Sequence, residues 1–86
     1  MNVYRLKIST PDGDMYDGEA VKLDVRGIEG ELAVMAGHIP FMTALVPCDV
    51  HLLLPDGSER VGSCESGLLS VGAAESTLLA SGFKWK

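Results

Sequence analysis

The chain has 86 residues, with 12 Asp and Glu against 7 Lys and Arg, which gives a formal net charge of −5. This length predicts a single domain spanning residues 1–86. The few basic residues form no stripe, which argues against nucleic-acid binding. No apolar run approaches the roughly 20 residues of a membrane-spanning helix, so we expect no direct membrane insertion.

The two cysteines do not form a disulfide framework. A metal site would need more ligands than the two cysteines, and only His38 and His51 could join them, so we expect neither a metal nor a cofactor. The whole net charge lies in residues 12–31, which contain seven acidic residues and only two basic ones. This segment is either a solvated, solubilising rim or an acidic face for the basic loops of a partner.

The N-terminal third alternates apolar and polar residues with a period of two. Tyr4, Leu6 and Ile8 alternate with polar neighbours, which predicts a strand with one face in water. The segment Thr10-Pro11-Asp12-Gly13 is expected to form a turn. Pro presets φ at the second turn position, and Gly adopts backbone conformations that other residues resist. A short return strand begins at residues 15–16, and residues 21–26 form another half-buried strand.

The middle of the chain is more apolar. Residues 32–36 are apolar throughout, which predicts a buried strand inside a sandwich. The motif Gly37-His38-Ile39-Pro40 ends this strand, and residues 41–45 form the next one. A turn at residues 46–49 follows.

The last part predicts a hairpin and two final strands. Residues 50–54 and 59–63 pair across Pro55-Asp56-Gly57, and residues 68–71 and 77–80 form the last strands. The tail at residues 83–86 is too short to be a domain. Strands recur about every eight to ten residues without a helical stripe, which predicts an all-β antiparallel sandwich or barrel.

The order of these segments resembles the epsilon subunit of rotary F-type ATP synthases. Residues 30–45 follow that family's pattern Gly-Glu-x-Gly-x-x-x-Gly-His-x-Pro-x-x-Thr-x-Leu, with Ala33 and Ala36 in place of the usual glycine and proline. Further similar segments are residues 10–13, 16–20, 50–57, 66–71 and 76–80, where Ser66 replaces the first of two glycines. The resemblance therefore covers nearly the whole chain in the family's order.

The resemblance implies an antiparallel β-sandwich of about ten short strands, the family's N-terminal domain. Many members add a C-terminal helical hairpin, and this chain stops where that hairpin would begin, so we expect the hairpin to be absent from it. The expected function is that of a non-catalytic central-stalk subunit that couples the gamma subunit to the membrane c-ring during proton-driven ATP synthesis. Such a subunit is peripheral to the energy-transducing membrane, on its cytoplasmic, matrix or stromal side.

The same resemblance suggests site residues, none of them catalytic or metal-binding. The expected ring-facing loop is Glu29, Gly30 and Glu31. The residues expected to face gamma or to fix the turn are Met35, Gly37, His38, Pro40, Phe41 and Met42. For each group a structural role remains open: an ordinary charged loop, a hydrogen-bonded turn histidine, or apolar core.

Two other functions are open. A free-standing β-sandwich binding module would have an aromatic-lined pocket, but the chain has only five aromatic residues. A small thiol hydrolase would pair Cys48 or Cys64 with a histidine, and neither cysteine lies in a recognisable nucleophile motif.

Nucleotide binding is not expected. The chain lacks a Gly-rich phosphate loop followed by Lys and Ser or Thr, and its acidic balance disfavours a polyphosphate. In many family members the C-terminal helices restrain ATP hydrolysis, and in some they bind ATP. We therefore expect coupling without self-inhibition and no specific ATP binding.

Overall fold

The computed structural model describes residues 2–37 and 39–86, so His38 lies outside the described residues. Within that part of the chain no helix is long and apolar enough to cross a membrane. The described strands are β1 (Tyr4–Thr10), β2 (Gly13–Ala20), β3 (Lys22–Gly27), β4 (Gly30–Met35), β5 (Phe41–Leu45), β6 (Cys48–Leu53), β7 (Glu59–Cys64), β8 (Gly67–Val71), β9 (Glu75–Ala80) and β10 (Phe83–Trp85).

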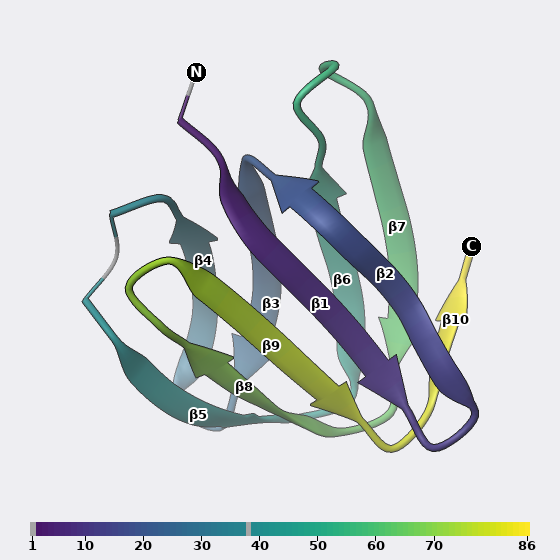
Figure 1. Ribbon diagram of the computed structural model, residues 1–86. Coiled ribbons are helices and arrows are strands. Elements are labelled where there is room, and N and C mark those ends of the chain that lie inside the picture. The colour runs from purple at the N-terminus through teal and green to yellow at the C-terminus, as the bar shows by residue number, and fades with distance from the viewer. Residues whose placement is uncertain (1, 38) are drawn as a thin grey trace.

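The strands form one sheet that folds over on itself into two layers. The strand order is β10-β7-β6-β3-β5-β8-β9-β1-β2, and β4 pairs with β3 off this path. In Figure 1, β1, β2 and β9 lie in the front layer, and β3, β6 and β7 lie behind them. The predicted all-β sandwich of about ten strands is therefore confirmed.

One pairing departs from the predicted antiparallel arrangement. β1 and β9 run parallel, with Arg5 opposite Glu75 and Leu6 opposite Ser76. A tight hairpin can join only antiparallel strands, but β1 and β9 come from opposite ends of the chain and are free of that constraint. The other pairings between described strands are antiparallel.

The core lies between the two layers and is built from the inward positions of the alternating strands. The largest fully buried side chains are Leu6, Ile8, Leu23, Leu52, Leu69, Leu78, Val34, Val50 and Cys64. Each buried aliphatic side chain contributes about 1.5–3 kcal/mol relative to an exposed one. The buried Tyr4 hydroxyl donates a hydrogen bond to the Val34 carbonyl oxygen at 3.1 Å, which satisfies its polar end.

The two ends of the sheet meet at a seam. The Trp85 indole Nε1 donates a hydrogen bond to the Met15 carbonyl oxygen at 3.1 Å, which links β10 to β2. The Arg60 guanidinium lies 3.8 Å from the centre of the Trp85 ring. The sequence alone indicates only that the tail at residues 83–86 is too short for a domain. In the structure it provides a final strand, β10, which pairs with β7. Three residues are too few to give a clear period-two signal.

The strand predicted at residues 32–36 is present as part of β4, but the prediction that it is buried is wrong. Only Val34 of β4 is buried, and Met35 is 49% exposed. Among the described strands β4 pairs only with β3, and its pleat sends alternate residues to the outer face whatever their hydrophobicity. The turn expected at residues 46–49 is also shorter, because β6 already begins at Cys48.

Candidate partner-binding site

The tip between β3 and β4 is a tight turn at one end of the sandwich. Gly27 and Gly30 are paired residues, so Ile28 and Glu29 occupy the apex. Gly30 has a φ of 125°, in the region that favours glycine. A Cβ at Gly30 would meet no atom within 4 Å, so the need for glycine is conformational and not steric.

The tip carries negative charge that the protein itself neutralises only weakly. Glu31 accepts a hydrogen bond from Arg26 at 3.4 Å, between side chains that are 80% and 58% exposed. An exposed pair of this kind contributes little, about 0–1 kcal/mol. Among the described residues Glu29 has no ion-pair partner. Both carboxylates are therefore available to basic groups of another molecule.

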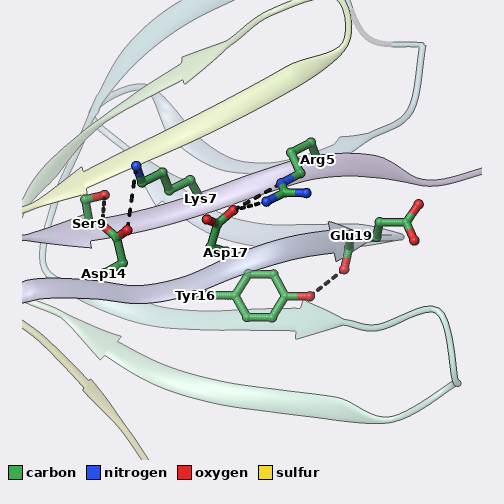
Figure 2. A network of polar contacts seen from close by, with 7 residues as sticks. All are labelled: Arg5, Lys7, Ser9, Asp14, Tyr16, Asp17 and Glu19. Carbon is green, nitrogen blue, oxygen red and sulfur yellow. Dashed lines mark hydrogen bonds and ion pairs between the residues drawn. The ribbon is translucent and has the colours of Figure 1, made fainter.

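The acidic residues of β2 differ from those of the tip, because basic side chains of β1 form ion pairs with them. Figure 2 shows Asp17 facing Arg5 and Asp14 facing Lys7, with N–O distances of 2.6 and 3.6 Å. The Ser9 hydroxyl also donates to Asp14 at 2.8 Å. The acidic segment at residues 12–31 is thus not a uniform face, and its unmatched charge includes the β3–β4 tip.

A groove of 420 Å³ connects this tip to β5. Its lining consists of Gly27, Glu29, Gly30, Glu31, Leu32, Ala33, Phe41, Met42 and Thr43. The groove exists because β3 pairs with β5 only at Gly27 and Leu45, so that β4 and β5 diverge beyond this point. A Cβ on Gly27 would lie 3.1 Å from Leu32 Cδ2 and 3.2 Å from Thr43 Oγ1, so a larger residue would crowd the floor.

The groove brings together part of the expected site. The three residues of the expected ring-facing loop line it, as do Phe41 and Met42. Met35 does not, because it lies at the opposite end of β4, paired with Lys22. Gly37, with a φ of 86°, and the exposed Pro40 are also absent from the lining. His38 lies outside the described residues.

Sequence reasoning missed three exposed apolar residues. Ile28 is 68% exposed at the apex of the tip, and Leu68 and Leu79 are 39% and 53% exposed. Leu68 is paired with Ala44 on one side and with Leu79 on the other, so these three form an apolar strip on the outer face of β5, β8 and β9. Met42, which is 63% exposed, lies two residues from Ala44 on the same face.

A signal for these residues was present in the sequence. Leu68-Leu69 and Leu78-Leu79 place apolar residues at consecutive strand positions, and the pleat must turn one of each pair outward. Ile28 stands between two glycines of a turn, where no core position is available. Apolar side chains in such places often mark an interaction surface.

A second groove, of 680 Å³, lies beside β3, β4 and the start of β6. Its lining is Asp24, Val25, Arg26, Glu31, Leu32, Ala33, Pro47, Cys48, Asp49 and His51. Of the residues that line these two grooves, Phe41 is the only aromatic one, which does not fit the binding-module alternative. Among the described residues no three His, Cys, Asp or Glu side chains form a group that could hold a metal ion.

The Cys64 thiol does not have the environment of a hydrolase nucleophile. Burial, and then the neighbouring Cys48, raise the pKa of the Cys64 thiol to about 11. A reactive cysteine needs a lowered pKa and access to solvent, whereas Cys64 is buried. The geometry therefore gives no support to hydrolysis through Cys64.

The molecule is a β-sandwich domain whose exposed apolar and acidic groups meet at one end. Residues 3–86 match the family described as the ATP synthase, Delta/Epsilon chain, beta-sandwich domain. The chain belongs to this family.

Relatives and solved structures agree with this assignment. The chain is 33% identical over 82 residues to the ATP synthase epsilon chain of Clostridium novyi, covering 95% of this chain and 63% of that protein. It is 30% identical over 82 residues to the ATP synthase epsilon chain, sodium ion specific, of Acetobacterium woodii, covering 95% of this chain and 62% of that protein. The chain thus spans less than two thirds of the length of these relatives.

The fold itself recurs in two solved assemblies. A chain in the cryo-EM structure of the Euglena gracilis mitochondrial ATP synthase, OSCP/F1/c-ring, matches with a TM-score of 0.91 at 18% identity, over 96% of this chain and 53% of that one. A chain of the Tetrahymena thermophila mitochondrial ATP synthase central stalk and c-ring matches with a TM-score of 0.78 at 12% identity, over 94% of this chain and 65% of that one. At these identities the likeness establishes the fold.

Proposed function

We propose that this chain is the β-sandwich part of a non-catalytic central-stalk subunit of an F-type ATP synthase. In this role it couples the gamma subunit to the membrane c-ring during proton-driven ATP synthesis. The subunit would be peripheral to the energy-transducing membrane, on its cytoplasmic, matrix or stromal side. The family membership of residues 3–86 supports this assignment.

The observation that carries the proposal is the groove at the β3–β4 tip. It places two weakly neutralised carboxylates, Glu29 and Glu31, beside the apolar side chains of Phe41 and Met42. Charged groups at an interface fix register and orientation, and buried apolar groups supply most of the binding energy. One end of the domain therefore has the means to contact two different partners, an acidic contact for the ring and an apolar one for gamma.

The rest of the domain suits a part that transmits force. Cross-strand pairing runs continuously from β10 to β2, and the hydrogen bond from Trp85 to Met15 joins these two strands. Close-packed interiors have low compressibility and pass displacement on without deforming. A load applied at the tip would therefore be carried through the whole sandwich.

Reversing both tip charges tests the ring contact. In an ATP synthase reconstituted with the Glu29→Lys/Glu31→Lys variant, we expect ATP-driven ion pumping to fall roughly threefold or more. The reason is that each reversal replaces an attraction for basic ring groups by a repulsion. Pumping is measured as the quench of a pH-sensitive dye in vesicles, and hydrolysis is measured in parallel.

A matched control separates coupling from folding. The Glu19→Lys/Glu59→Lys variant has the same charge change on two exposed residues outside the tip groove, and it should pump normally. Both double variants should unfold within a few degrees of the wild type, because exposed substitutions usually change stability by within about 0.5 kcal/mol. Unchanged pumping by the tip variant, or equal loss in the control, would show that the tip is not a ring contact.

The gamma contact predicts a different defect. Met42 is 63% exposed beside the groove, so Met42→Glu leaves the core intact but would place a charge in an apolar interface. We expect at least about a tenfold loss of affinity for isolated gamma, because an unpaired buried charge costs several kcal/mol. Met42→Leu, which keeps the apolar surface, should bind within about twofold of wild type. Titration of gamma by calorimetry measures both, and normal binding by Met42→Glu would remove Met42 from the interface.

A further inference from the structure

Two cysteines that are far apart in the sequence lie side by side in the sheet. Cys48 begins β6 and Cys64 ends β7, and the two are direct partners in the antiparallel register. Directly opposed residues in such a pair have Cα atoms about 4.5 or 5.5 Å apart, depending on whether they are hydrogen-bonded. Both values fall within the roughly 4.4–6.8 Å that a disulfide spans.

Both side chains also point to the same face. Along β6, Cys48, Val50 and Leu52 alternate with the exposed Asp49 and His51, so Cys48 is on the inner face. Cys64 is on the inner face of β7, and it is buried. Two opposed thiols on one face of a sheet need no change of register to bond to each other.

The two thiols differ in their access to solvent. Cys48 is half-buried and lines the 680 Å³ groove beside β3, β4 and the start of β6. Cys64 is 1% exposed, and its thiol donates a weak hydrogen bond to the Ser66 carbonyl oxygen at 3.5 Å. A small oxidant can therefore reach Cys48 first, and Cys64 is placed to react second.

We propose that Cys48 and Cys64 form a reversible thiol–disulfide site, which hydrogen peroxide oxidises to a bond that joins β6 to β7. The Cys48 thiolate attacks one peroxide oxygen, the O–O bond breaks, and Cys48 becomes a sulfenic acid with release of hydroxide. The Cys64 sulfur then attacks the Cys48 sulfur, the S–O bond breaks, and water leaves. Overall, two thiols and one peroxide give one disulfide and two waters.

The position of the bond gives it a structural consequence. Cys64 is paired with Cys48 on one side and with Phe83 of β10 on the other. A disulfide at this point closes the β6–β7 hairpin and fixes the strand that holds β10. Since it restricts the unfolded chain, we expect the oxidised protein to unfold about 10–20 °C above the reduced one. This inference does not rest on the proposed function.

The test is treatment of the 86-residue chain with hydrogen peroxide, followed by unfolding, thiol labelling and intact-mass measurement. We expect a monomer that has lost two hydrogens and both reactive thiols, and that dithiothreitol restores. In Cys64→Ser, the reaction should stop at a Cys48 sulfenic acid that dimedone traps. In Cys48→Ala, the folded protein should keep its Cys64 thiol.

The contrary outcomes are equally distinct. The site does not exist if the wild type keeps both thiols, if Cys48 is over-oxidised while Cys64 stays free, or if the main product is a dimer linked through Cys48. An oxidised protein that unfolds at or below the temperature of the reduced one would also overturn the proposal, because the bond would then not fit the native register. The Cys48→Ala arm decides the matter even if Cys64→Ser folds poorly, since Cys48 is only half-buried.

Discussion

Replacing Leu78 with alanine is expected to remove about 2–5 kcal/mol from the free energy of unfolding. Leu78 is fully buried on β9, where it is paired with Ile8 of β1 and with Leu69 of β8. Truncation leaves a cavity between two strands whose backbones are fixed by hydrogen bonds on both sides, so the site has little freedom to collapse. The loss is a large fraction of the roughly 5–15 kcal/mol by which small domains are stable.

The neighbouring leucine provides the control. Leu79 has the same side chain on the same strand but is 53% exposed on the outer face. Leu79→Ala should change the unfolding free energy by no more than about 0.5 kcal/mol. Urea unfolding of both variants, at equal denaturant slope, measures the difference. Similar losses at the two positions would mean that β9 is rotated and that the alternation of its faces is misassigned.

These two leucines also show how much of the fold the sequence could reveal. Alternation of apolar and polar residues located the strands, because a pleated strand with one wet face requires it. At Leu78-Leu79 and Leu68-Leu69 the alternation fails, and only the pairing with neighbouring strands decides which leucine is buried. The apolar strip on β5, β8 and β9 was therefore hidden within segments that were correctly predicted as strands.

The remaining errors have related causes. The parallel pairing of β1 with β9 depends on contacts between distant parts of the chain, which local patterns do not encode. The wholly apolar run at residues 32–36 indicated burial, but β4 is off the main path of the sheet and leaves Met35 exposed. In the candidate site, the turn at residues 27–30 and the nearby apolar Phe41 and Met42 were predictable. The groove that joins them required the divergence of β4 from β5.

Alkaline pH is expected to destabilise the domain through two buried acids, Tyr4 and Cys64. Burial is the main cause of the raised pKa of Tyr4, and Asp24 and then Tyr16 add to it. For Cys64, burial and then Cys48 and Glu65 raise the pKa from 9.0 to about 11, against a smaller lowering by the backbone of Ser66. In both cases burial raises the cost of the anion by more than any neighbouring group lowers it.

The direction of the effect follows from where each proton is held more tightly. Both groups keep their proton more strongly in the folded state than in the unfolded one, so the stability they contribute is complete below their unfolded pKa values. It is lost as the pH rises, from about 9 to about 11 for Cys64, and from about 10 upward for Tyr4. The shift of Cys64 alone corresponds to a loss on the order of 2–3 kcal/mol.

Urea unfolding in the presence of a reductant, at pH values between about 8 and 11, measures this loss. In the wild type the free energy of unfolding should fall ever more steeply above about pH 9. Cys64→Ala should flatten the first part of the fall, and Tyr4→Phe should flatten the part above about pH 10, even though each variant is less stable at neutral pH. The double variant retains the slope due to Tyr16, whose pKa is also raised by burial, and to the growing net negative charge. If the free energy of unfolding of the double variant falls with pH as steeply as that of the wild type, the pKa values of Tyr4 and Cys64 are not raised by folding, and this prediction is wrong.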